Sequence, residues 1–260
     1  MNLGVQGKVA LVAASSKGLG YGVARALAAD GARVSMCSRD SAAIEAAAQR
    51  LAQETGAQTL ATACDVTQPA AIENWVARSV DAWGQIDMLL VNASGPPAGI
   101  FKELTDTQWQ AAFELTLMSS IRMIRAVLPH MQPGSAILTI TSSSVKEPIE
   151  RLALSTVMRA GVAGLVKTLA DELSGDGIRV NNLIPGRIDT DRVAQLDQGA
   201  AKRLGIPVEE VRRRSEADIP LKRLGTIDEF GRAAAFLLSP AASYITGASL
   251  VVDGGKMRSI

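Results

Sequence analysis

Short, almost uniformly apolar runs alternate with longer stretches of helical periodicity along the whole chain. An apolar run without polar alternation is typical of a strand that helices cover on both faces. Strands that alternate with helices in this way predict βαβ units and one parallel sheet. The seven predicted strands are Val9–Ala14, Arg33–Cys37, Thr59–Cys64, Met88–Asn92, Ala136–Thr141, Arg179–Ile184 and Ser249–Val252. The five predicted helices are Gly18–Asp30, Ser41–Thr55, Pro69–Trp83, Thr107–Met131 and Leu152–Leu173.

One stretch, residues 190–217, departs from this rhythm. It is polar and ends in the arginine run Arg212–Arg214. A structureless loop of this length is uncommon in a compact domain and usually serves as a lid or a binding segment. We therefore expect it to cover the substrate. The arginine run is expected to be a solvated helix face, and steering of an anionic thioester carrier is the alternative.

Composition narrows the class of protein. No linker divides the 260 residues, which favours one α/β domain. Their net charge of +1 argues against a nucleic-acid or anionic membrane partner. No apolar run approaches the roughly 20 residues of a membrane helix, and the first residues lack a signal-peptide pattern. Two cysteines, Cys37 and Cys64, and one histidine, His130, predict no disulfide framework and no metal site. We expect a cytoplasmic protein in which His130 is a helix-end residue.

A glycine-containing turn joins the first predicted strand to the first helix. Glycines in such a turn let the backbone approach a pyrophosphate, which then meets the N–H groups at the helix N-terminus. This strand–turn–helix context predicts a nucleotide site in a Rossmann-type, doubly wound fold. The residues expected to bind are Ser15, Ser16, Lys17, Gly18, Leu19 and Gly20.

The end of the second strand bears on which nucleotide binds. Ser38 and Arg39 stand where NAD-binding folds carry an acidic residue for the ribose hydroxyls, and an arginine suits a 2′-phosphate. Lys17 would add a second cation. A solvated loop charge is the simpler interpretation of Arg39, and Asp40 weakens the phosphate interpretation. On balance we predict NADP(H).

These residues and several later blocks resemble the short-chain dehydrogenase/reductase family, in the subgroup with the 3-oxoacyl-(acyl-carrier-protein) reductases. The resemblance covers essentially the whole chain. It implies that Asp65 and Val66 contact the adenine, that Asn92 and Ala93 line the cofactor, and that a Pro-Gly block holds the nicotinamide carboxamide. The matching blocks are Cys64-Asp65-Val66, Asn92-Ala93, Pro185-Gly186-Arg187-Ile188-Asp189-Thr190, Pro220–Gly225 and Tyr244–Gly255.

The chain departs from the family pattern at several positions. Ala13-Ala14 replaces the Thr-Gly of the turn, Val91 and Ser94 replace an Asn and a Gly, and Thr116 replaces the helix asparagine. The catalytic serine of the family falls on Ser142. Where the family has Tyr-x-x-x-Lys, this chain has Ser155 and Arg159, and its two tyrosines, Tyr21 and Tyr244, lie elsewhere.

These departures weaken the chemistry that the resemblance implies, in which a tyrosine protonates the carbonyl oxygen beside a lysine. Residues four apart share a helix face, so Ser155 and Arg159 keep the geometry and change the groups. A serine hydroxyl is a far poorer proton donor than a phenol, and an arginine does not relay protons. Substitute donors would be Lys146, Arg187, Ser143 or Ser144, although Lys146 is more simply an exposed loop charge. Ser142 could be a strand-end hydroxyl bonded to the backbone, but its place at the carboxyl end of a strand favours a site role.

Two functions follow from these residues. The first is an NADP(H)-dependent oxidoreductase that acts on a small-molecule carbonyl, alcohol or acyl thioester, with Ser142, Ser155, Arg159 and Thr116 at its catalytic site. The second is a catalytically silent NADP(H)-binding sensor or scaffold. We favour the enzyme, because Ser142 and the nicotinamide block survive. The resemblance also implies a homotetramer, because in that subgroup the helix that falls on Ser155–Asp171, here rich in small residues, and the C-terminal block build two interfaces.

Overall fold

Seven parallel strands form one sheet in the computed structural model, which describes residues 3–259. The strand order is β3-β2-β1-β4-β5-β6-β7, so the predicted doubly wound parallel sheet is confirmed. Each strand starts at the predicted residue, and the predicted and observed ends differ by at most two residues. The strands are β1 (Val9–Val12), β2 (Arg33–Ser38), β3 (Thr59–Ala63), β4 (Met88–Val91), β5 (Ala136–Ile140), β6 (Arg179–Pro185) and β7 (Ser249–Val252).

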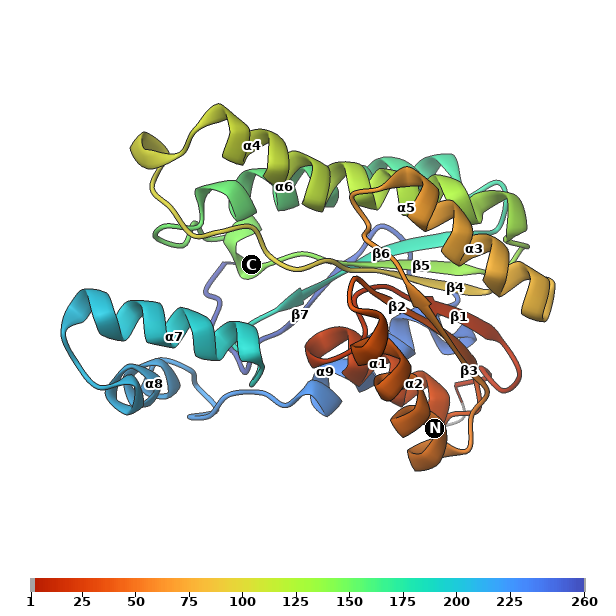
Figure 1. Cartoon of the computed structure of the whole chain (residues 1–260), viewed down its shortest axis with the longest axis horizontal. Coiled ribbons are helices and arrows are strands. Elements are labelled where there is room, and N and C mark those ends of the chain that lie inside the picture. Colours follow the sequence, from red (N-terminus) through yellow and green to blue (C-terminus); the bar gives the residue numbers. More distant parts are fainter. Residues whose placement is uncertain (1–2, 260) are drawn as a thin grey trace.

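Helices cover both faces of the sheet because the central strands are apolar on both sides. In β1, Ala10 and Val12 contribute to the core on one face, and Val9 and Leu11 contribute to the core on the other. One face carries α1 (Gly18–Ala29), α2 (Ser41–Thr55) and α9 (Ile227–Leu238) (Figure 1). The opposite face carries α3 (Pro69–Trp83), α5 (Ser119–Val127) and α6 (Ala153–Glu172).

Helix α9 was missed by the sequence prediction. It begins with a capping box in which the Thr226 side chain accepts from the Glu229 N–H and the Glu229 carboxylate accepts from the Thr226 N–H. It packs on α1 so closely that a Cβ on Gly231 would lie 2.3 Å from the carbonyl oxygen of Gly22. The backbones of α1 and α9 therefore lie almost in direct contact where the two helices cross.

The long helix predicted at Thr107–Met131 is a composite. It consists of α4 (Asp106–Ala112), a π-helical segment (Phe113–Met118), α5 and a 3₁₀ turn (Leu128–His130). A π-helical segment within an α-helix is frequent at functional sites, and this one contains Thr116. Further 3₁₀ turns lie at Phe101–Glu103, Ser143–Val145 and Pro240–Ala242.

The polar stretch 190–217, for which the sequence predicted no helix or strand, is ordered into two helices, and its role as a substrate lid stays a prediction. Helix α7 (Asp191–Leu204) is followed by Gly205, which caps its C-terminus with a left-handed φ of 66°. Helix α8 (Val208–Ala217) comes next. The arginine run lies on α8 and is exposed, in ion pairs with Asp189, Glu210 and Glu216. The two helices lie together at one end of the molecule (Figure 1).

Candidate cofactor and substrate site

The predicted site residues gather at the carboxyl ends of the parallel strands. From β1 the chain continues to β2 and β3 on one side, and it then crosses back to β4 on the other side of β1, so the strand order reverses between β1 and β4. In open α/β sheets, ligands bind at such a switch point, beyond the carboxyl ends of the strands. The loops that follow β1, β2, β3, β4, β5 and β6 all start from this edge because every strand pair is parallel.

The turn after β1 is tightly folded. Ala14 has a φ of 50° and Gly18 a φ of 61°, so this turn uses the left-handed region twice. A Cβ on Gly20 would lie 2.3 Å from the Ala14 carbonyl oxygen. No side chain caps the N-terminus of α1. The N–H groups in the first turn of that helix are the groups that a helix N-terminus leaves without intrahelical partners.

The polar residues of this turn differ in what they can offer a ligand. Ser15 is fully buried, and its hydroxyl donates to the Val12 carbonyl at 2.8 Å, so it holds the turn together. Lys17 is exposed and forms a 2.6 Å ion pair with Asp191 at the start of α7. Ser16 and Leu19 are half-buried, and Leu19 packs on the core. Lys17 as a second cation for the phosphate stays a prediction, and in this structure the lysine is engaged by an exposed acidic partner.

The ends of β2 and β3 form the next part of the edge. Arg39 is exposed, and within the described chain it has no hydrogen bond or ion pair. Asp40 caps α2, since its carboxylate accepts the Ala43 N–H at 3.0 Å. Asp65 is likewise occupied by the N–H and hydroxyl of Thr67, at 3.0 and 2.9 Å. Asp40 therefore has a structural role, and the N-terminus of α2 partly offsets its negative charge.

The remaining residues at this end are packed into the fold. Ser38 is half-buried and donates to the Asp40 carbonyl at 3.1 Å, and Val66 belongs to the core. Cys37 and Cys64, which precede the two loops, are buried free thiols. Burial raises the pKa of the Cys37 thiol, and a hydrogen bond with Cys37 lowers the pKa of the Cys64 thiol.

The loops after β4 and β6 close on the β1 turn. The Asn92 side chain donates to the Ala13 carbonyl at 3.4 Å, and Ala93 packs on the neighbouring core. Thr190 caps α7, and its methyl group lies 3.7 Å from the position of a Cβ on Gly18. Segments far apart in the sequence thus meet at one place.

The Pro-Gly block itself is anchored to the C-terminal block. A Cβ on Gly186 would lie 2.4 Å from Cβ of Asp253, so only glycine fits there. Pro185 ends β6, and Ile188 is buried and bridges to Gly225. This block therefore has little freedom to move.

Arg159 connects the predicted catalytic residues. It lies on α6 and is buried, and its Nη1 donates to the carbonyls of Ile140 at 2.7 Å and Thr141 at 3.1 Å. Its Nε donates to the Ser155 hydroxyl at 3.3 Å. Because Ser142 follows Thr141 directly, the arginine holds α6 against the strand end that carries Ser142. Burial, with a smaller effect from the charge of Arg192, lowers the pKa of Arg159 to about 10.

Ser142 and Thr116 complete this group. The Ser142 oxygen accepts the Ser144 N–H at 3.1 Å, as in the strand-end interpretation, and its own hydroxyl proton remains available to donate. Thr116 is buried in the π-helical segment, which packs against α6, and its hydroxyl has no partner in the described chain. Its carbonyl accepts the Ser120 hydroxyl at 2.6 Å.

The substitute proton donors are less well placed. Lys146 is exposed and makes no side-chain contact within the described residues, which agrees with an ordinary loop charge. Arg187 forms an ion pair with Asp197, which is buried in α7. The Ser144 hydroxyl is buried without a partner in the described chain. His130 lies at the end of a 3₁₀ turn, as expected.

Sequence reasoning missed three residues that the structure brings to this edge. Asp191, Arg192 and Asp197 all lie on α7. Asp191 and Arg192 bond to distant loops, at Lys17 and Pro96, and Asp197 pairs with Arg187 after β6. Thr190 followed by Asp191 is a helix-start signal that could have revealed α7. No signal in the sequence shows which loops these side chains reach.

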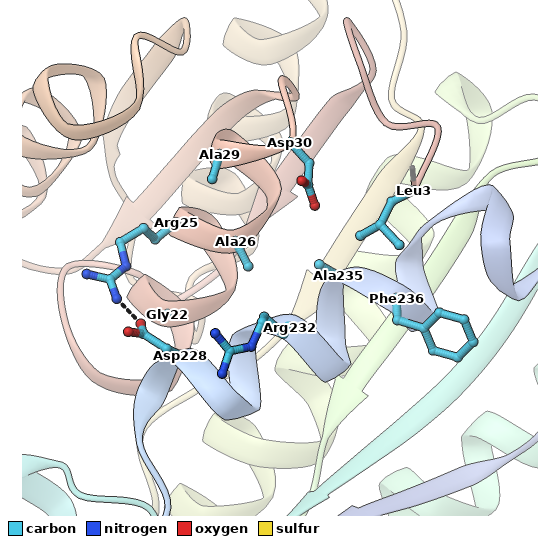
Figure 2. Close-up of a pocket in the computed structure, with 10 residues that line it drawn as sticks. All are labelled: Leu3, Gly22, Arg25, Ala26, Ala29, Asp30, Asp228, Arg232, Ala235 and Phe236. Atoms are coloured by element: carbon cyan, nitrogen blue, oxygen red, sulfur yellow. Dashed lines mark hydrogen bonds and ion pairs between the residues drawn. The ribbon is translucent and has the colours of Figure 1, made fainter. Parts of the chain in front are cut away.

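A pocket of about 590 Å³ lies elsewhere, between α1 and α9 (Figure 2). Leu3, Ala26 and Phe236 line it, and the ion pair of Arg25 with Asp228 lies at one side. It contains none of the predicted site residues. The pocket follows from the small residues with which α1 and α9 face each other, and we assign the site to the carboxyl edge of the sheet.

Within residues 3–259, no group of three or more His, Cys, Asp or Glu side chains could hold a metal ion.

Helix α6 is long and apolar enough to cross a membrane, with a mean hydropathy of 1.2. Our expectation that no segment approaches the length and hydropathy of a membrane helix is therefore wrong. The helix packs on β6 and on the π-helical segment, as a core helix does.

Comparison with known proteins agrees with the geometry. A family model described as enoyl-(acyl carrier protein) reductase matches residues 13–256. Short-chain dehydrogenase/reductase SDRA of Arabidopsis thaliana is 34% identical over 256 residues, which cover 96% of this chain and 95% of the relative.

Two solved structures are informative. L-sorbose reductase from Gluconobacter frateurii, in complex with NADPH and L-sorbose, has a TM-score of 0.95 and 30% identity over 100% of both chains. A short-chain oxidoreductase from Pseudomonas aeruginosa, described as containing an atypical catalytic center, has a TM-score of 0.89 and 30% identity over 97% of this chain and 98% of its own. With the family model and the curated relative, these similarities show that the chain belongs to the short-chain dehydrogenase/reductase family.

Proposed function

We propose that this protein is an NADP(H)-dependent oxidoreductase that interconverts a small-molecule carbonyl and its alcohol. The observation that carries the proposal is the Ser155–Arg159 hydrogen bond of 3.3 Å, held beside Ser142 by the bonds of Arg159 to the end of β5. When bound, NADPH supplies the hydride that reduces a carbonyl carbon. The NADPH complex of the sorbose reductase supports this choice of cofactor.

The residues at the edge of the sheet fit this cofactor. The glycine turn and the uncapped N-terminus of α1 suit a pyrophosphate. Arg39 has no partner in the described chain and could bind a 2′-phosphate, because Asp40 is occupied at the start of α2. By the family resemblance, Asp65 would contact the adenine, Arg159 the nicotinamide ribose, and Ile188 and Thr190 the carboxamide.

The chain's own residues must orient the carbonyl and protonate its oxygen. The Ser142 and Ser155 oxygens each accept one hydrogen bond from the protein, so both hydroxyls remain free to donate to a substrate oxygen. The positive charge of Arg159 stabilises negative charge on Ser155, and thereby makes that hydroxyl a better donor. We assign Ser155 as the proton donor and Ser142 as the residue that polarises the carbonyl.

The substrate and the compartment are further parts of the proposal. The expectation of an acyl thioester depends on the C-terminal blocks alone, so such a compound belongs in the assay beside simple ketones and sugars. We place the protein in the cytoplasm, because Cys37 and Cys64 are free thiols that suit a reducing compartment.

We expect the protein to bind NADPH more tightly than NADH, and Arg39→Ala to remove about tenfold of that preference. A charge-assisted hydrogen bond to phosphate supports a factor of this size at an exposed position. Fluorescence titration of both cofactors measures the effect. Arg232→Ala is the matched control, since Arg232 is an exposed arginine on α9 that lines the pocket of Figure 2. Equal affinity for the two cofactors in the unmodified protein contradicts the prediction.

We also propose a homotetramer in which α6 and β7 meet their copies in neighbouring subunits. Val157 on α6 is 53% exposed and Leu250 on the edge strand β7 is 39% exposed, so apolar side chains face solvent on both elements. Uncovered edge strands and apolar faces are usually buried by a partner. Light scattering at micromolar concentration should give the mass of four chains, and Leu250→Arg should reduce it. A monomer in the unmodified protein contradicts the proposal.

A further inference from the structure

Arg192 is a half-buried cation in the first turn of α7. Its Nη2 donates to the Pro96 carbonyl at 3.0 Å. The same nitrogen lies 3.2 Å from the position that a Cβ on Gly95 would occupy. The guanidinium therefore lies against the loop after β4. Within residues 3–259 it has no carboxylate partner, whereas Arg187 and Arg212 are each paired with an acid.

Arg159 is a second arginine that has no carboxylate partner among the described residues. Its hydrogen bonds go to the Ser155 hydroxyl and to two backbone carbonyls, all of them neutral acceptors. Burial, and to a smaller extent the charge of Arg192, lowers the pKa of Arg159, so the two cations repel each other. Two cations that are partly desolvated and unpaired are unfavourable unless an anion binds between or beside them. The site is therefore electrostatically incomplete in the absence of a ligand.

Two buried hydroxyls in segments that pack on α6 also lack partners among residues 3–259. These are the Thr116 hydroxyl in the π-helical segment and the Ser144 hydroxyl in the turn after Ser142. A buried polar group without a hydrogen bond is costly, and such groups in native proteins call for an explanation. A polar ligand bound beside these segments would supply one.

The position of Arg192 separates it from the proposed adenosine end. Its neighbour Asp191 instead forms an ion pair with Lys17 in the β1 turn. The loop that Arg192 contacts continues to Gly99, whose N–H donates to the Arg151 carbonyl at 2.7 Å, just before α6. Arg192 thus belongs with the ends of β4, β5 and β6, whereas Arg39 follows β2 on the far side of β1.

We propose that Arg192 is a specificity residue that binds a carboxylate on the carbonyl substrate. The inference rests on the proposed function, and it narrows the substrate class to oxo acids and hydroxy acids. Arginine matches a carboxylate with two parallel N–H donors. Such a pair can form from the second hydrogen of Nη2 together with Nη1 or Nε, and neither Nη1 nor Nε has a partner among the described residues. With one end of the substrate held in this way, its carbonyl group is oriented toward Ser142 and Ser155.

The test compares a keto acid with its uncharged ester. The probes are 4-oxopentanoate and methyl 4-oxopentanoate, titrated by calorimetry into the NADPH complex of the full chain. We expect the unmodified protein to prefer the acid, and Arg192→Met to reduce its affinity for the acid by about 10- to 100-fold while leaving the ester unchanged. Arg192→Lys should retain part of the preference because it keeps the charge and loses the paired donors.

Arg203→Met is the matched control, since Arg203 is an exposed arginine in the last turn of the same helix. It should leave the preference for the acid intact. If Arg192→Met weakens NADPH binding by the same factor as acid binding, the anion is a cofactor phosphate and the proposal is overturned. An unmodified protein that does not distinguish the acid from the ester overturns it as well. The NADPH titration of the unmodified protein reports separately on the proposed function.

Discussion

Gly20→Ala should lower the free energy of unfolding by about 2–3 kcal/mol and weaken NADPH binding at least about tenfold. The added Cβ would lie 2.3 Å from the Ala14 carbonyl oxygen, and a backbone atom cannot move aside as a flexible side chain can. The turn must shift, and with it the N-terminus of α1 that we propose for the pyrophosphate. Urea unfolding and fluorescence titration measure the two effects.

Gly199→Ala is the control for this substitution. Gly199 lies in α7 with nothing within 4 Å of an added Cβ, so alanine should stabilise the helix by about 0.5–1 kcal/mol. Cofactor affinity should not change. If Gly20→Ala unfolds at the same urea concentration as the unmodified protein, the close approach in the turn has no energetic role and the prediction is wrong.

The double substitution Ser155→Tyr with Arg159→Lys should accelerate carbonyl reduction by about 10- to 100-fold, which is less than a positioned general acid can supply. A phenol beside an ammonium group is a better proton donor than a serine hydroxyl. The gain is limited because Ser155 is buried and a tyrosine ring must displace its neighbours. Lysine also lacks the two separate nitrogens with which Arg159 binds the residue-155 side chain through Nε and the carbonyls of Ile140 and Thr141 through Nη1.

Rates of NADPH oxidation with a panel of ketones, oxo acids and an acyl thioester measure this effect. Ser155→Ala should slow the native reaction, and Lys146→Ala should not, because Lys146 is an exposed loop residue. A double variant that loses activity, together with a Lys146→Ala variant that is inactive, would show that Lys146 is the native donor. A protein that binds NADPH but reduces nothing, before and after the double substitution, is a sensor or scaffold.

The sheet could be predicted from the sequence because its strands are apolar runs of the right length, each bounded by helical periodicity. Helix α9 follows a polar connection, and the prediction overlooked its one clear signal, Thr226 three residues before Glu229. The interruption of the long helix at Phe113–Met118 could not be predicted, because no glycine or proline marks it. Its amphipathic pattern is that of an ordinary helix.

The family resemblance was enough to predict which residues lie at the candidate site. It was not enough to predict which hydrogen-bond or ion-pair partner each side chain would have. Ser15 stands in the glycine turn, yet its hydroxyl binds the backbone of β1. Lys17 pairs with an acid 174 residues away. Such a partner depends on where α7 lies, which no local pattern determines. Arg192 was overlooked for the same reason. Its lack of a carboxylate partner among the described residues depends on where α7 places it, and no local pattern shows that.

Helix α8 buries none of its residues, whereas α9 buries half of its length in the core. The hydrogen-bonded turns of α8 are therefore secured by its contact with α7 and by exposed ion pairs such as Arg212 with Asp189, each of which contributes little. Segments held in this way open locally at a much lower free energy than the core does. The backbone amides of α8 are accordingly among the first to exchange their hydrogens with solvent, and the loop around Gly205 is a natural first point of cleavage for a protease.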